Sequence, residues 1–499
     1  MRPLFLFIRP PRPQWPFNGP TTAFWPPLAF ASMAAALREK VPAVEVAILD
    51  APAQAMGWTT LARHLHSLNP KFIAIGEEAV SCVEGLRIAR LAKELGARVI
   101  AGGCFFSWVA PQVLCGKLVD VVVHGEGEQT IVELAHALLE DDSSALRQVD
   151  GISFLDGEEP VFTGWREPVA DLDSLPFPAW DLLPMDKYGS RSRHHPGFAS
   201  IEASRGCSHG CEFCILWRQM GRFHAHRVVP YLRVKSAERL AEEIRILMDR
   251  FQRRYLGWVD PCFNADPHLA ASLSQLLLRD NRVLGQSAWL RADYLLRDHD
   301  SGALRLWSSA GWNEAYLGIE RMDPSELARL GKGNLNGEAH RAANLLQASY
   351  PNVVSFGSAI YGFAWDTPET VRALFSAVER LPLDHIFFIP ATPLPGTPFW
   401  ESRIWDPSGA AFRSFDFVPR PGSGAAHPEL STEIARSYLF RWSPERLRKT
   451  LAGLLSRNPR RRGITWNISC RVLPLFLSSA FPSDAGSTRG MIFPAWYES

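Results

Sequence analysis

The sequence predicts an α/β protein with two parallel β-sheets in succession, the first doubly wound and the second a barrel or partial barrel. Two observations carry this prediction. Short apolar runs alternate with helical stretches from residue 1 to about 145, and the strand-then-helix rhythm returns six times between residues 198 and 400. Apolar strands separated by helices are typical of parallel sheets covered on both faces. The remaining residues, 401–499, predict a small helical C-terminal domain.

The first half predicts a Rossmann-like domain over residues 1–145, whose ligand should lie at the carboxyl ends of its strands. Its expected strands are 4–8, 44–49, 72–76, 98–101 and 119–123, with helices near 27–39, 59–67, 84–95 and 129–140. Gly102-Gly103 after the fourth strand lets a ligand approach the backbone. No G-x-G-x-x-G follows the first strand, so a dinucleotide is disfavoured.

Residues 146–197 predict a connector between the two halves. A hairpin is expected over 152–162, around Asp156-Gly157. The stretch 171–184 holds too much proline for a regular element, but it should be ordered because Trp180 and its leucines need burial. His194 and His195 are expected in a surface loop.

The second half, residues 198–400, predicts six βα units with their chemistry at the carboxyl ends of the strands. The expected strands are 198–203, 254–260, 286–291, 314–319, 353–361 and 385–390. Ser236 is placed to cap one helix, and Thr367-Pro368 to begin another. In the tail, helices are expected near 430–439 and 443–456, covering the open mouth of the barrel.

Three cysteines stand directly after the first strand of this second half. Cys207, Cys211 and Cys214 are spaced C-x3-C-x2-C, so a loop can wrap a cuboidal iron–sulfur cluster with one thiolate on each of three irons. The fourth iron then keeps an open position for a small molecule. A structural zinc with His209 as fourth ligand is the alternative, although zinc sites usually pair two C-x2-C units and no second unit exists here.

The cysteine spacing after a strand resembles the radical S-adenosylmethionine (SAM) superfamily. In that family the three cysteines hold a [4Fe-4S] cluster, the open iron binds SAM, and reductive cleavage gives a 5'-deoxyadenosyl radical. Two further stretches agree with the resemblance. Residues 317–321 (L-G-I-E-R) are similar to the family's G-I-E-S, and residues 392–398 are similar to its T-P-x-P-G-T segment. Six βα units match the family's partial (β/α)6 barrel.

The resemblance implies a SAM site at the strand ends. Arg291 could pair with the SAM carboxylate, because arginine is the natural partner of a carboxylate, and Glu320 is the strongest candidate for a SAM contact, toward the ribose hydroxyls. Asp260 suits the SAM amino group or the substrate, with a helix-capping role as the alternative. The expected SAM contacts are Phe213, Asp260, Arg291, Glu320 and Gly362.

The first half resembles the cobalamin-binding domain that is fused to one large class of radical SAM enzymes. A proline-rich first loop, G-G after the fourth strand and G-E-G-E after the fifth carry the resemblance, as does the string that precedes the cysteines. The D-x-H-x-x-G motif, which gives a histidine to cobalt, is absent, so cobalamin binding without that histidine is expected. A domain that has lost its ligand is the alternative. The expected cobalamin contacts are Trp25, Pro26, Gly102, Gly103, Gly125, Glu126 and Gly127.

Composition limits the partners. The net charge is +1, which gives no electrostatic reason to expect nucleic acid or an anionic membrane, and the basic run 457–462 is expected to be a solvated helix end. Eight cysteines in 499 residues do not form a disulfide framework, which implies a reducing cytoplasm. Cys82, Cys104 and Cys115 could be ligands of a second cluster, which methylthiotransferases carry. We interpret them instead as buried core residues. Cys262 and Cys470 are read as inert buried thiols rather than hydrogen donors.

The expected function is therefore a cobalamin-dependent radical SAM methyltransferase acting on an unactivated carbon of a small molecule. The resemblance implies that one SAM methylates cobalamin and a second yields the radical, and that flavodoxin or ferredoxin supplies electrons. Two alternatives remain open: a related cyclase or rearrangement enzyme that transfers no methyl group, and a non-catalytic cobalamin carrier or sensor. The intact cysteine motif argues against the last.

Overall fold

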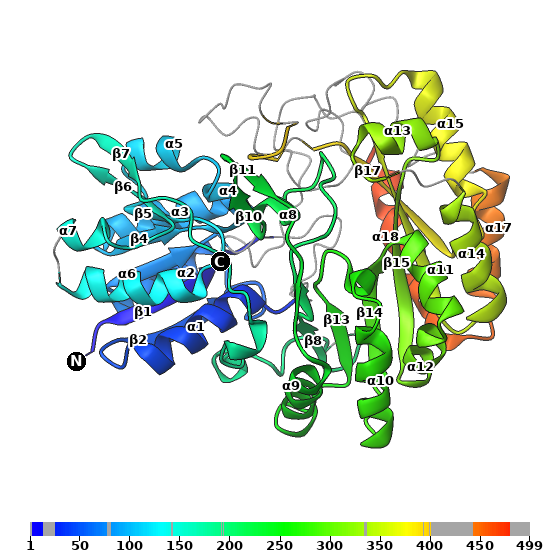
Figure 1. Ribbon diagram of the computed structural model, residues 1–499, viewed down its shortest axis with the longest axis horizontal. Helices are drawn as coiled ribbons and strands as arrows, with labels where there is room; N and C mark the ends of the chain where they lie inside the picture. Colours follow the sequence, from blue (N-terminus) through cyan, green and yellow to red (C-terminus); the bar gives the residue numbers. More distant parts are fainter. Residues whose placement is uncertain are drawn as a thin grey trace.

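The structure is a computed structural model. It describes residues 2–12, 25–76, 81–140, 143–190, 192, 194–333, 337–392, 394–398, 400 and 443–479, with side chains as far as residue 469. Figure 1 shows two α/β halves side by side, with α8, β10 and β11 between them.

The first sheet has the strand order β2-β1-β3-β4-β5-β6-β7, and its first five strands are parallel. Alternate residues of these strands pack against α1 and α6 on one face and against α2, α3 and α5 on the other. This confirms the doubly wound fold and all four predicted helices. The elements are β1 (Leu4–Arg9), α1 (Leu28–Lys40), β2 (Glu45–Asp50), α2 (Trp58–Leu68), β3 (Phe72–Ile75), α3 (Cys82–Glu94), β4 (Arg98–Ala101), α4 (Gly103–Phe106), α5 (Ala110–Cys115), β5 (Val121–Val123), α6 (Glu128–Glu140) and α7 (Ser143–Leu146).

The predicted hairpin is present as β6 (Ile152–Asp156) and β7 (Glu159–Phe162). Although the sequence placed it in the connector, β6 pairs antiparallel with β5 and so extends the first sheet. This pairing covers the edge that β5 would otherwise expose. The proline-rich stretch that follows is ordered as predicted, with Leu172 and Trp180 1% exposed. It contains the short 3-10 turns η2 (Leu172–Ser174) and η3 (Trp180–Leu182).

The second sheet is a row of six parallel strands in the order β8-β13-β14-β15-β16-β17. It is the predicted partial barrel: its outer face packs on helices, and its two edge strands are not paired with each other. The strands are β8 (Phe198–Ile201), β13 (Tyr255–Trp258), β14 (Gly285–Leu290), β15 (Trp312–Glu320), β16 (Val354–Tyr361) and β17 (His385–Pro390). We call the carboxyl ends of these strands the mouth of the barrel.

The helices of this half follow the predicted rhythm. Ser236 accepts a hydrogen bond from the Arg239 amide, and Thr367 forms a capping box ahead of Pro368, so both predicted caps are confirmed. The elements are α9 (Ala237–Asp249), η4 (Phe263–Ala265), α10 (Leu269–Arg279), α11 (Ala292–Asp300), α12 (Ala303–Ser309), α13 (Pro324–Arg329), α14 (Glu338–Ser349) and α15 (Pro368–Glu379). Between β8 and α9 lie five short elements that the sequence did not indicate: β9 (Ser204–Arg205), α8 (Leu216–Gln219), β10 (Arg222–His224), β11 (Arg227–Val229) and β12 (Arg233–Val234).

The described part of the tail comprises α17 (Pro444–Leu454) and α18 (Pro459–Ser479), whereas the helix expected near 430–439 lies outside the described residues. These two helices do not cover the mouth as expected. Ile464 of α18 packs on Val354 and Phe356 near the start of β16, so α18 closes the amino-terminal end of the barrel. None of the described helices combines the length and the apolarity that a bilayer crossing requires.

Two sequence interpretations fail at this closed end. Arg460 is not a solvated helix-end charge, because it lies 3.1 Å from the buried Glu314 carboxylate. His195 is not a free surface residue either, since its Nε2 lies 2.7 Å from the same carboxylate. Glu314 is 1% exposed, and a buried carboxylate requires such partners. A cation 146 positions away along the chain could not be assigned to it from the sequence.

Candidate active site

The three cysteines lie in the loop between β9 and α8, at the mouth of the barrel. All three are free thiols of intermediate exposure. Burial raises the pKa of Cys214 to about 12 and also raises that of Cys211, and in each case the neighbouring cysteines contribute. The three thiols are therefore mutual neighbours in a partly dry setting, where binding a metal centre displaces their protons.

Two contacts fix the cysteine loop against the barrel. The Glu212 amide donates to the Leu330 carbonyl at 2.9 Å, in the turn after α13. Gly331 in this turn has a φ of +66°, and a Cβ at its position would lie 3.0 Å from the Gly210 carbonyl oxygen. Only glycine both adopts this backbone conformation and leaves room for the loop. The turn at 330–331 therefore forms a seat for the cysteines.

Lys332 is a residue of this site that the sequence interpretation missed. It is 6% exposed, and its charge opposes the rise in the pKa of Cys211, which burial causes. Arg291 acts on Cys211 in the same direction. The thiols thus face two buried cations, which favour thiolates and the net negative charge of a ligated cluster. Two glycines flank Lys332, and this G-K-G was the available signal.

The zinc alternative finds no support in the described residues. No three His, Cys, Asp or Glu side chains among them are placed to hold one metal ion. His209, the fourth ligand considered, instead places its Nε2 2.8 Å from the Tyr294 hydroxyl. A cluster offers a separate iron to each thiolate, so its ligands need not converge on one point. The donor set therefore fits an iron–sulfur cluster.

Glu320 ends β15 at the mouth. Its φ is +63°, in the left-handed region, and the register of β15 against β16 shifts at this point. Its carboxylate accepts a hydrogen bond from the Lys332 ammonium at 3.0 Å and lies 3.4 Å from the Ser358 hydroxyl. A Cβ at Gly318 would come within 2.8 Å of both the Glu320 carboxylate and Lys332, so glycine keeps this space open.

Arg321, the cation that follows Glu320 in the sequence, points elsewhere. Its guanidinium pairs with Asp366 at 2.7 Å and with Glu326 at 2.5 Å. Asp366 also accepts the Gly362 amide at 2.7 Å, and Gly362 has a φ of +88°. Arg321 and Asp366 thus hold the turn after β16 in which the predicted SAM contact Gly362 lies.

Two of the other predicted SAM contacts have protein partners. Asp260 is 1% exposed and accepts hydrogen bonds from the Ala203 amide, at 3.1 Å, and from Ser204. It thereby secures the chain that leads into the cysteine loop. Arg291 is paired with Asp293 at 3.0 Å and donates to the Lys332 carbonyl at 3.1 Å.

Phe213, between the second and third cysteines, packs with apolar residues of the mouth. It contacts the small cluster of Leu330, Ile360, Phe363, Trp365 and Ala391, which lie at or just after the ends of α13, β16 and β17. The predicted SAM contacts are thus gathered at one end of the barrel around the cysteines.

The glycines predicted to receive cobalamin have roles within the first sheet. Gly103 has a φ of +75°, and a Cβ there would overlap the Gly76 carbonyl of the neighbouring turn. A Cβ at Gly127 would overlap the Met33 sulfur of α1. Close approach of backbone segments therefore explains these glycines without a ligand. Residues 13–24 and 77–80, which follow β1 and β3, lie outside the described residues. The structure therefore describes the expected cobalamin site only on the side of β4 and β5.

Trp25 and Pro26, the other predicted cobalamin contacts, reach into the barrel. The Trp25 ring stands edge-on to Phe198 of β8, with 4.8 Å between the ring centroids. Ser200 of β8 donates from its hydroxyl to the Pro26 carbonyl at 3.3 Å. Gly257 of β13 gives Trp25 its space, since a Cβ there would lie 2.5 Å from the indole ring.

Glu126 and Glu128 belong to a buried ion network that joins the two halves. Arg205, two positions before Cys207, lies 2.6 Å from Glu128 and 3.4 Å from Glu126. Arg233 lies 2.5 Å from Glu126. Burial opposes ionisation of Glu128, but the Arg205 cation outweighs it and lowers the pKa of Glu128. We call these four residues the inter-domain network. Arg205 was missed from the sequence, where its place beside the cysteine motif was the available signal.

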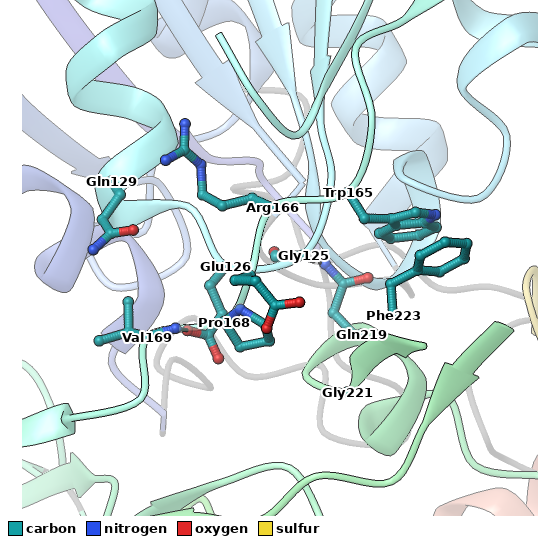
Figure 2. Close-up of a pocket in the computed structure, with 11 residues that line it drawn as sticks. Gly125, Glu126, Gln129, Trp165, Arg166, Pro168, Val169, Gln219, Gly221 and Phe223 are labelled. Atoms are coloured by element: carbon teal, nitrogen blue, oxygen red, sulfur yellow. Dashed lines mark hydrogen bonds between the residues drawn. The ribbon is translucent and has the colours of Figure 1, made fainter. Parts of the chain in front are cut away.

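A small cavity lies beside this network, and Figure 2 shows its lining. Gly125 and Glu126 line one side, Trp165 and Phe223 stack over it with their ring centroids 5.7 Å apart, and Gln219 follows the cysteine loop. Its volume of about 20 Å³ suits about one water molecule. The Gln219 amide donates to the Gly125 carbonyl at 2.9 Å, which seals the junction.

The remaining cysteines differ in their burial. Cys82 is 2% exposed and Cys262 is 4% exposed, and burial raises the pKa of each to about 12, as expected of inert thiols. Cys104 is half-buried and Cys115 is exposed, so the expectation of three buried cysteines in the first half is correct for Cys82 only. A second cluster finds no ligand set among the described residues. Cys470 lies beyond the last described side chain.

An open six-stranded βα barrel with three free thiols at its mouth fits an iron–sulfur enzyme of the radical SAM class. Comparison with known families agrees. The family model described as the B12 binding domain matches residues 18–135, and that of the Radical SAM superfamily matches residues 201–375. The chain therefore carries a B12-binding and a radical SAM domain, as cobalamin-dependent radical SAM enzymes do, and these domains imply a [4Fe-4S] cluster, SAM and cobalamin as cofactors.

Three proteins illustrate what the chain is similar to. An uncharacterized methyltransferase of Pyrococcus horikoshii is 28% identical over 384 residues, which cover 76% of this chain and 78% of that protein. The anaerobic magnesium-protoporphyrin IX monomethyl ester cyclase of Cereibacter sphaeroides is 25% identical, covering 76% of this chain and 60% of the cyclase. The radical SAM methyltransferase TsrM of Kitasatospora setae has the same fold, with a TM-score of 0.64 at 18% identity over 80% of this chain and 75% of TsrM.

Proposed function

We propose that this enzyme transfers a methyl group to an unactivated carbon of a small molecule. One observation carries the proposal. The carboxyl edge of the first sheet and the mouth of the barrel face each other, and the inter-domain network ties the loop after β5 directly to the segment before Cys207. Such an arrangement lets a methyl donor held by one half and a radical generated by the other act on the same substrate.

In this proposal each residue of the mouth has a task. Cys207, Cys211 and Cys214 hold the cluster, while Lys332 and Arg291 balance its charge. Glu320 hydrogen-bonds SAM, Gly362 leaves room for its nucleoside, and Phe213 excludes water from the cluster. Asp260 positions the loop rather than touching SAM. When bound, the cofactors supply the radical and the transferable methyl group, and the protein orients them and keeps water out.

The wider assignments are proposals of the same kind. Residues 1–145, extended by the 152–162 hairpin, hold cobalamin at the strand ends where Trp25, Gly102 and Gly125 lie. The stretch from there to 197 connects the halves, 198–400 form the radical domain, and α17 and α18 form the described part of a helical tail. His124 places its Nε2 2.8 Å from Ser153, so we do not assign it to cobalt. A flavodoxin- or ferredoxin-like protein would supply electrons to the cluster.

The test is the anaerobically purified protein with its iron, sulfide and cobalt contents and its absorption spectrum. We expect about four irons and one cobalt per chain, and deoxyadenosine from SAM upon reduction. The protein is also reconstituted with hydroxocobalamin and desalted. If it then retains no cobalt, it has no bound methyl donor, and the proposal is wrong.

A second candidate, ring formation without methyl transfer, is favoured by the likeness to the magnesium-protoporphyrin cyclase. The two functions differ in the mass of the product. With SAM labelled in its methyl group, the methyltransferase gives a product that carries the label, and the cyclase gives one that does not.

A further inference from the structure

Four aromatic side chains form a continuous row across the inner face of the barrel. Trp289 of β14, Tyr316 of β15 and Phe356 of β16 are direct neighbours in the strand register, and Phe387 of β17 completes the row. Their ring centroids lie 5.1, 4.5 and 5.6 Å apart in sequence, and the last two pairs are stacked. We call these four residues the aromatic belt.

The belt faces the interior of the barrel and not the outer helices. Tyr316 shares its face of β15 with Glu314, because side chains two apart point the same way. The intervening residues Ala315 and Leu317 instead pack in the outer core. Since Trp289 stands two residues before Arg291, the belt lies roughly 7 Å below the mouth at β14, at about 3.3 Å per residue.

The space beneath the belt is closed. Ile464 and Ile468 of α18 pack with Tyr316 and Phe356. The Tyr316 hydroxyl donates to Glu314 at 3.2 Å, and that carboxylate is paired with His195 and Arg460. A molecule that enters the barrel from the mouth therefore meets the belt as its floor.

The two ends of the belt are exposed although its middle is packed. Trp289 is 37% exposed and Phe387 is 38% exposed, while Phe356 between them is 4% exposed. Val259, on the same face beside β13, is 36% exposed. Large apolar side chains on a concave face, next to a few placed polar groups, are typical of a ligand site.

The charged groups around this floor are matched. Glu314 is paired with Arg460 below it, and Arg291 with Asp293 above it. Glu320 is paired with Lys332 at the mouth. These groups therefore present no unbalanced charge toward the belt, and a charged substrate portion would lose its hydration there without compensation.

We propose that the aromatic belt is the substrate shelf, and that the substrate has a flat, uncharged, apolar portion such as an aromatic or fused-ring system. This inference rests on the proposed function, because it takes the barrel to be where the substrate reacts. The ring system lies over Trp289 and Phe387, and the reacting carbon is held toward the cluster side. Stacked or edge-on aromatic contacts and the burial of the exposed ends of the belt supply the affinity.

The experiment measures binding and not turnover. The full chain with its cluster, cobalamin and SAM, without reductant, is titrated with 1-aminoanthracene, a neutral fused-ring probe whose fluorescence rises in apolar surroundings. We expect the protein to bind the probe saturably. The affinity should fall about tenfold or more in Trp289→Ala and in Phe387→Ala, whereas Trp289→Phe should keep the affinity of the unsubstituted protein. Cluster absorbance and melting temperature, recorded for each variant, separate loss of the shelf from loss of the fold.

The matched control is Leu451→Ala. Leu451 is 49% exposed, but it lies on α17, away from the interior of the barrel. The probe affinity should not change in this variant. Unchanged affinity in both belt variants, or a loss confined to Leu451→Ala, would overturn the shelf. A lowered melting temperature with unchanged affinity would do the same, by making the belt ordinary core.

Failure of the shelf and failure of the proposed function give different results. If the enzyme cleaves SAM and binds cobalamin but the belt variants bind the probe normally, the shelf is wrong and the function stands. If no cobalt is retained, the function fails, and the probe result still decides whether the belt binds flat apolar molecules.

Discussion

Glu320 has a backbone conformation that few residues besides glycine adopt, with a φ of +63°. A non-glycine residue held there costs roughly 1–3 kcal/mol, and such residues cluster at functional sites. Glu320 also carries a carboxylate paired with the buried ammonium of Lys332. The surrounding structure, including the ion pair with Lys332, must therefore stabilise the strained backbone of Glu320. The resulting conformation directs the Glu320 carboxylate across the mouth.

Glu320→Gln should therefore change two properties. It should weaken SAM binding about ten- to a hundredfold, because a hydrogen bond to a charged group contributes roughly 1.5–3 kcal/mol. It should also lower the melting temperature, since Lys332 would be left as a buried unpaired charge. Isothermal titration with SAM and thermal unfolding, on one anaerobic preparation, measure both.

The control for this prediction is Glu320→Gln combined with Lys332→Met, which removes both charges. The double variant should regain stability but not SAM affinity. If SAM affinity returns together with stability, Glu320 only holds the strand end and Lys332.

The cysteines give the second prediction at this scale. Cys207→Ala, Cys211→Ala and Cys214→Ala should each lose most of the cluster, because two thiolates hold it poorly. The absorbance near 400 nm, the iron content and reductive SAM cleavage should fall together. Cys262→Ala is the control, as a buried thiol with its pKa raised to about 12, and it should keep its iron. Retention of deoxyadenosine formation in all three cysteine variants would exclude the cluster assignment.

At the residue scale the sequence predicted the cysteines and the position of Glu320 but missed the partners that hold them. Spacing in the chain identifies a motif, because its members are neighbours in sequence. Lys332 is 12 positions from Glu320, and Arg205 is 77 positions from Glu128. Such pairings arise from the fold, so they could not be read from the sequence alone. Asp260 was placed correctly at a strand end, but the geometry turns its carboxylate to the Ala203 and Ser204 amides.

Helices and strands could be predicted from the sequence where the spacing of apolar residues and the capping residues indicate the same element. The six strands of the barrel and the helices begun by Ser236 and Thr367 follow local rules that need no tertiary information. The exceptions depend on distant contacts. The 152–162 hairpin was recognised from Asp156-Gly157, but only the sheet shows that β6 pairs with β5. The tail was expected to cover the mouth, but its helix α18 packs at the other end of the barrel, because a helix does not specify which end of a sheet its apolar face covers.

The inter-domain network gives a prediction at the scale of elements. Glu128→Gln should leave Arg205 partly unpaired in a buried site, which costs about 3 kcal/mol. Because Glu128 begins α6 and Arg205 ends β9, hydrogen exchange should rise together around residues 121–128 and 204–214. The same variant should lose cobalamin and iron in parallel.

The control is Glu133→Gln, which breaks an exposed ion pair between α6 and Arg166 of the connector. Such surface pairs contribute roughly 0–1 kcal/mol, so hydrogen exchange near the cysteines should not change. Faster exchange confined to the first half in Glu128→Gln would show that the network does not couple the two sites.

The two halves of the molecule share one continuous hydrophobic core. One hydrophobic core runs from α1 and α6, through Trp180 of the connector, to the outer helices of the barrel. Trp25 contacts β8 from the other half, and Gln219 seals the junction beside Gly125. These contacts place the carboxyl edge of one sheet opposite that of the other, which neither half could achieve by itself. The sequence predicted both sheets but contained no local signal for their relative placement.

The stability of the whole molecule should depend on pH through His124. This residue is 7% exposed, lies among Phe162 and Trp165, and burial lowers its pKa from 6.5 to about 4. Between these two values the unfolded chain binds a proton that the folded chain does not, so this contribution is complete above pH 6.5 and is lost as the pH falls toward 4. From pH 7 to 5 the loss should be about 2 kcal/mol of the free energy of unfolding. In urea unfolding, His124→Gln should show a smaller decrease over this interval by about that amount. An equal decrease in both proteins would mean that His124 is protonated in the folded state.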